Sequence, residues 1–281
     1  MSEYAVYEPT EKSWATVKNA FSYAWKNKRL VWKLILFYGP FFLLALLLNA
    51  VAQVTSMEQY AHWAFFGLIA ALGDFILSIF VPIFVAVTWH RVVINGPEET
   101  KFSNPLAPKK RDWKFLGFWL LIGFIAFIFT TVLIGGSAFL AVTFYAIVPV
   151  VSLLAVLLGI ALFVYSVYAA TRVSFIFPSI ATDHNYPVKT IWRMSKGLVM
   201  KLWGAGFLSM LVMIPLTILF VAFPAIIAFL ISAVAGGKAM FAILGVFVLA
   251  PIFIFMQVFF SVIGITLLSN YFMVAKQRLN A

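Results

Sequence analysis

Long apolar stretches separated by short polar segments make up most of the chain. Six of them exceed the roughly 18 residues that a helix needs to cross a bilayer, and they cover residues 31–54, 64–93, 113–139, 143–170, 203–233 and 240–275. A membrane β-barrel would instead show short segments of alternating polarity. The pattern therefore predicts an all-α, polytopic membrane protein with six transmembrane helices.

Short turns pair these spans into hairpins within a single membrane domain, residues 1–281. The predicted parts, in order, are an interfacial helix at 11–29, hairpin 1 at 31–93, a cytoplasmic linker at 94–112, hairpin 2 at 113–170, a segment that we call the collar at 171–202, and hairpin 3 at 203–275. Residues 1–10 are expected to form a polar tail.

Two segments outside the spans have helical periodicity with one apolar and one basic side. In the segment 11–29 the apolar residues recur at Trp14, Val17, Phe21 and Trp25. In the collar, residues 188–202 repeat this pattern, with lysine and arginine on the second side. Both patterns predict amphipathic helices that lie in the membrane interface.

The basic residues predict the orientation of the chain in the membrane. Of 20 Lys and Arg residues, only Lys238 falls on one side of the predicted spans. Because positive residues are retained on the cytoplasmic side, we expect both termini in the cytoplasm of a bacterial cell, with the chain in its cytoplasmic (inner) membrane.

Composition narrows the range of partners. The chain is 64% hydrophobic and only 10% charged, whereas soluble domains carry about 25% charged residues. The net charge of +11 comes from residues beside the spans, so we expect contacts with anionic phospholipids rather than with nucleic acid. The sequence has no cysteine, which excludes disulfides and thiol chemistry.

The collar contains the part of the sequence that most resembles a known protein family. A span ends in Arg-Val-Ser-Phe-Ile-Phe-Pro-Ser-Ile-Ala (Arg172–Ala181), and Thr-Ile-Trp-Arg-Met-Ser-Lys-Gly (Thr190–Gly197) precedes the next span. Together with the Trp-His-Arg that closes the second span, this resembles the YciC-like bacterial six-helix inner-membrane proteins, including the membrane region of some glycerophosphodiester phosphodiesterases. The resemblance implies a six-helix membrane fold. The soluble phosphodiesterase domain is missing, so that activity is not implied.

No nucleotide-binding, zincin or hydrolase signature is present, and we expect neither enzymatic activity nor a cofactor. His62, His90 and His184 lie at different membrane levels or far apart in the sequence. Since His62 is predicted outside and His90 in the cytoplasm, we expect no metal site that includes both. The leading hypothesis is an accessory or scaffold subunit, or a membrane-homeostasis factor, that binds lipid and another membrane protein or a second copy of itself. The residues expected at the headgroups or a partner are Trp89, Arg91, Arg172, Trp192, Arg193 and Lys196.

An alternative hypothesis for the function depends on Asp74. Asp74 lies ten residues into the second span, which places it about 15 Å deep, and a carboxylate at that depth needs a partner or a wet cavity. Gln257 is the expected partner, with Asn49 and Gln53 further out. The pattern is compatible with a proton- or ion-coupled transporter or channel, and also with a structural hydrogen bond between helices.

Overall fold

The computed structural model describes residues 4–56, 62–98, 100–145, 149–222, 226, 229–230 and 250–280, and the elements in these ranges are helices. In chain order they are α1 (Ser13–Lys26), α2 (Lys28–Thr55), α3 (Ala64–Asn95), α4 (Lys110–Tyr145), α5 (Pro149–Ser174), α6 (Ile176–Ala181), α7 (Val188–Met194), α8 (Val199–Thr217), the π-helical turn η2 (Ile218–Ala222) and α11 (Ala250–Asn280).

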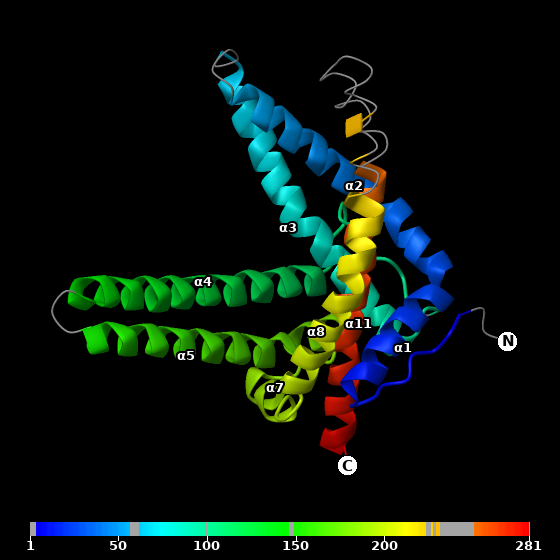
Figure 1. Cartoon of the computed structure of the whole chain (residues 1–281). Coiled ribbons are helices and arrows are strands. Elements are labelled where there is room, and N and C mark those ends of the chain that lie inside the picture. Colours follow the sequence, from blue (N-terminus) through cyan, green and yellow to red (C-terminus); the bar gives the residue numbers. More distant parts are fainter. Residues whose placement is uncertain are drawn as a thin grey trace.

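Six of these helices are long and apolar enough to cross a membrane: α2, α3, α4, α5, α8 and α11. The predicted all-α, multi-pass class is thereby confirmed. Spans one to four appear as two antiparallel pairs, α2–α3 and α4–α5 (Figure 1). The turn of the third hairpin, with Lys238, lies outside the described residues.

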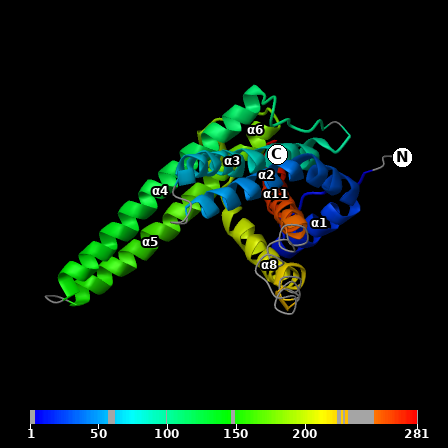
Figure 2. The same ribbon diagram turned by 90° about the horizontal axis from the view of Figure 1, so that it is seen from above.

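The helix pairs spread from a common end instead of forming one closed bundle. Figures 1 and 2 show α4 and α5 running side by side, away from α2, α3, α8 and α11. No residue in the most apolar window of α4 is buried. Its apolar surface therefore needs lipid or another protein as its environment.

The core lies at the common end. The largest fully buried side chains are Trp89, Tyr38, Tyr271, Phe84, Phe175 and Phe272. The short helix α6 packs against α3, α4 and α11, and α7 packs against α5 and α11. The collar is thus the part of the chain on which the ends of the long helices converge.

Two glycines allow α2 and α3 to lie close together. A Cβ added at Gly73 would stand 2.9 Å from Cδ1 of Leu48, and one at Gly67 would overlap the side chain of Thr55. Small residues at such positions let membrane helices approach closely. This close approach fixes the level at which polar side chains of the two helices meet.

A helix forms over most of the segment 11–29, since α1 begins at Ser13 and ends at Lys26. Val17 is buried, while Trp14 and Trp25 are exposed. The buried side of α1 packs against α8 and α11 (Figure 1). Its placement in the membrane interface stays a prediction.

Two asparagines fix the N-terminal segment, which was expected only as a polar tail. The side-chain amide of Asn27 accepts from Ala5 N (3.1 Å) and donates to Ala5 O (3.3 Å). Asn270 of α11 does the same with Thr10, at 2.8 Å for both bonds. Each amide satisfies both backbone groups of one residue, as a neighbouring strand would. We call residues 4–12 the N-terminal strap.

Candidate functional site: the collar and its cationic contacts

The collar contains two short helices and one sharp turn. The amphipathic helix expected over 188–202 is interrupted: α7 ends at Met194 and α8 begins at Val199. Gly197 between them has φ +76°, a left-handed conformation that favours glycine and ends helices. The expectation of one continuous helix was therefore wrong.

The segment Asp183–Pro187 forms a tightly bonded turn between α6 and α7. Asp183 and Asn185 have φ values of +63° and +51°, which these two residue types tolerate better than most. Ser179 of α6 holds the turn, because its carbonyl accepts from the backbone N–H groups of His184 and Asn185. The two left-handed residues thereby project polar side chains from the collar.

Both of these side chains contact the first turns of α4. Arg111 donates from Nη1 to Asp183 Oδ2 (3.1 Å), and Lys114 donates to Asn185 Oδ1 (2.5 Å). Asp112 is buried and accepts from Lys109 N (2.7 Å), in the manner of a capping box. These bonds fix the orientation of the α4 N-terminus against the collar.

Arg91, in the last turns of α3, lies near the charged residues of α4 and of the collar turn. Arg111, Asp112 and Asp183 all lie close enough to act on its charge. The Nε atoms of Arg91 and Arg111 are shielded from solvent, and neither has a hydrogen-bond partner in the described part of the chain. Arg111 Nε also lies 3.9 Å from Asp112 Oδ1. The two guanidinium groups together concentrate positive charge that suits an added anion such as a phosphate.

Arg172 is used inside the protein, which corrects its predicted role as a headgroup contact. It is 8% exposed, lies 4.0 Å from the ring centroid of Trp192 and donates to the Trp192 carbonyl and to Ser195 Oγ. Its stacking and hydrogen bonds connect α5 to α7. Trp192 is half-buried by this contact, whereas Arg193 and Lys196 are exposed and stay candidates.

Trp89 was also expected at the headgroups and is fully buried. Its Nε1 donates to Thr266 Oγ1 of α11 (2.8 Å). The helical periodicity of the span end did not show that α11 covers this side of α3. Trp89 therefore belongs to the core that joins hairpin 1 to hairpin 3.

His184 links the collar to the end of α11. Lys276 Nζ donates to His184 Nε2 (2.7 Å), while Thr182 donates its hydroxyl hydrogen to Pro178 O (2.7 Å). Nδ1 of His184 therefore carries the ring hydrogen and donates it to Thr182 Oγ1, 2.8 Å away. Burial and the neighbouring Lys276 lower the pKa of His184, which favours this neutral form.

Asp74 has a different partner from the one expected. Asn49 Nδ2 donates to Asp74 Oδ2 (2.9 Å), Ser78 Oγ donates to Oδ1 (3.1 Å), and Gln53 donates to Asn49 (2.7 Å). The pairing with Gln257 was wrong, because α2 contributes the groups next to Asp74 at this level. Asn49, expected further out, fills the role.

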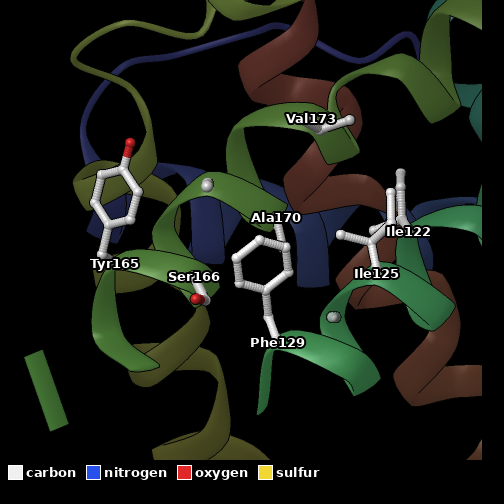
Figure 3. Close-up of a pocket in the computed structure, with 9 residues that line it drawn as sticks. Ile122, Ile125, Phe129, Tyr165, Ser166, Ala170 and Val173 are labelled. Atoms are coloured by element: carbon white, nitrogen blue, oxygen red, sulfur yellow. The ribbon is translucent and has the colours of Figure 1, made fainter. Parts of the chain in front are cut away.

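An apolar groove of about 230 Å³ lies between α4 and α5. Figure 3 shows Phe129 of α4 lying toward Ala170 of α5, with Tyr165 at the edge. Ser166 also lines the groove, and its hydroxyl donates to the Leu162 carbonyl within α5. The lining contains no charged group, so the groove suits an acyl chain better than a polar substrate.

No protein-family model, curated protein or solved structure matches this chain. The resemblance of the collar to the YciC-like membrane proteins thus stays a prediction, and the site has to be interpreted from its own chemistry.

Proposed function

We propose that this chain is a non-enzymatic integral membrane protein that binds anionic phospholipid headgroups and a protein partner at its collar, as an accessory or scaffold subunit. The observation that carries the proposal is the pair of neighbouring guanidinium groups of Arg91 and Arg111, whose positive charges act on each other. A lipid phosphate beside the two guanidinium groups would offset this repulsion.

Exposed cations also occur in the linker before α4, at the start of α4 and in the collar. They are Lys101, Lys109, Lys110, Lys189, Arg193 and Lys196. Each basic residue near an anionic membrane surface contributes about 1 kcal/mol of attraction. The pair would supply the specific contact, and these exposed cations would supply long-range attraction.

The proposal includes a bacterial inner-membrane location with both termini in the cytoplasm. It is supported by the one-sided distribution of lysine and arginine. Reporter fusions at each end test the orientation: an alkaline phosphatase fused to either terminus should be inactive, and activity at either end would contradict it.

Native mass spectrometry of the full-length protein tests headgroup binding. After delipidation, the protein is incubated with phosphatidylglycerol and phosphatidylcholine of matched chains. We expect one retained phosphatidylglycerol, lost in Arg91→Gln and kept in Lys12→Gln, a control cation on the exposed side of the strap. Equal retention of both lipids, or equal behaviour of the two variants, would refute the proposal.

The same spectra, recorded after gentle extraction from native membranes, test the partner. A protein companion at fixed ratio, displaced by Arg193→Glu together with Lys196→Glu, is the expected result. A species carrying lipid alone would contradict the scaffold part of the proposal and leave the headgroup part standing.

One observation favours a second candidate, a proton- or ion-coupled transporter. Gln53, Asn49, Asp74 and Ser78 form a connected line of hydrogen bonds within α2 and α3. Such lines occur where protons or ions move across membranes. Flux into liposomes should then depend on pH and be abolished in Asp74→Asn, and flux that this substitution leaves unchanged would eliminate the candidate.

A further inference from the structure

Helix α1 separates two hollows of different chemistry. On one side is an apolar groove of about 530 Å³ with aromatic walls from three elements, Trp25 of α1, Phe220 of η2 and Phe259 of α11. Its volume falls within the range of about 300–1,000 Å³ typical of ligand sites. The groove is large enough and apolar enough for a lipid chain.

On the other side lies a polar hollow of about 190 Å³, between α1 and the N-terminal strap. Glu8 of the strap and Lys26 of α1 both line it and both are exposed. None of the ion pairs among the described residues involves either side chain. The hollow therefore offers one negative and one positive group, and each is available to a ligand.

Ser22 lines both hollows. It precedes Lys26 by one helical turn, so the apolar groove and the polar hollow meet across a single ridge of α1. Beside that ridge, Lys28 lies 5.3 Å from the ring centroid of Trp25, an attractive cation–π geometry that helps to fix the aromatic wall. An occupant that spans the ridge must be apolar at one end and carry both charges at the other.

We propose that α1 holds a zwitterionic phospholipid with a primary ammonium headgroup, of the phosphatidylethanolamine class. One acyl chain occupies the apolar groove, Lys26 binds the phosphate, and Glu8 accepts hydrogen bonds from the ammonium group. Phosphatidylcholine fits less well, because its quaternary ammonium has no N–H to donate. Phosphatidylglycerol lacks a cation for Glu8. This site is separate from the Arg91–Arg111 pair and goes beyond the headgroup binding proposed above.

The test uses full-length protein, delipidated and titrated with phosphatidylethanolamine, phosphatidylcholine or phosphatidylglycerol of matched chains, with lipid occupancy read by native mass spectrometry. Because the Arg91–Arg111 pair is expected to retain one phosphatidylglycerol, phosphatidylglycerol is compared in Arg91→Gln. There we expect one molecule of phosphatidylethanolamine to bind in preference to the other two lipids. Leu216→Trp fills the groove and should weaken this binding about tenfold, equal to about 1.4 kcal/mol, or roughly two buried methylene groups. Leu211→Trp, an exposed leucine of the same helix outside the groove, is the matched control.

Glu8→Gln is the second variant, and its exposed position keeps it independent of folding. It should lower the preference for phosphatidylethanolamine over phosphatidylcholine by about 2- to 5-fold, the range of an exposed ion pair, while Lys18→Gln on α1 should not. Equal affinity of the wild-type protein for the ethanolamine and choline lipids would overturn the proposal. So would an unchanged preference in Glu8→Gln. Arg91→Gln should leave this binding intact, so the two sites can fail separately.

Discussion

The bond network around Asn270 predicts a large effect from a single substitution. Asn270 is fully buried and is the partner of Tyr7 Oη (3.3 Å), Thr10 N and Thr10 O. Burial raises the pKa of Tyr7, so its hydroxyl is protonated and donates to Asn270. Asn270→Leu keeps a side chain of similar size and removes every one of these bonds.

Two donors would then lose their partner, the buried Tyr7 hydroxyl and the half-buried Thr10 N–H. An unsatisfied buried group costs about 1–3 kcal/mol. Thr10 is only half-buried, so part of its penalty is relieved when the strap detaches into water. We therefore expect the attachment of the strap to weaken by about 2–4 kcal/mol, which raises the detached population about 30- to 1,000-fold.

Tryptic cleavage after Lys12 in detergent-solubilised protein measures this population, because cleavage of an opened segment follows its equilibrium when opening is fast. The control is Asn19→Leu, which removes one long hydrogen bond from α1 to Glu8 O (3.4 Å) and should change cleavage by less than about threefold. If Asn270→Leu is cleaved no faster than this control, the strap is not held by Asn270 and the reasoning fails.

Three further predictions concern the collar and hairpin 1. Arg172→Lys should lower the unfolding free energy by about 1–3 kcal/mol in thermal or urea denaturation, because lysine cannot both stack on Trp192 and donate sideways; an unchanged midpoint would contradict this. The folded protein favours neutral His184, so stability should be full above about pH 6.5 and fall at lower pH. His184→Gln, which can still accept from Lys276, should flatten that slope, and an identical slope would refute the assignment. Gly67→Val should cost about 1–3 kcal/mol by overpacking α2 against α3, and equal melting would show that the pair can shift apart freely.

The sequence was sufficient for the helices themselves, because a continuous apolar run of this length admits few other structures in a membrane. The sequence was insufficient to predict whether individual side chains at the span ends point into the protein or toward the headgroups. Trp89 and Arg172 stand at the ends of spans, where a tryptophan or an arginine is equally suited to the headgroups. Only the packing of α11 and α7 against them decides that both point inward.

The break in the predicted collar helix has a signal in the sequence, at Lys196 and Gly197. A lysine followed by Gly197 is typical of a helix C-terminus, and the left-handed Gly197 does separate α7 from α8. The partner of Asp74 is a harder case, since several amides of the predicted spans could reach it. The close approach at Gly73 selects Asn49, and that approach depends on tertiary packing.

The attachment of the N-terminal strap to α11 also has a consequence for biosynthesis. Thr10 and Asn270 are 260 positions apart, and Glu11 accepts from Arg278 across 267 positions. At about 5–20 residues per second, a ribosome needs roughly 13–50 s to progress from one to the other. During that time the first residues have no partner on α11, and insertion of the last span supplies it. Closure of the strap is therefore expected to be a late step, which can occur only after α11 has been inserted.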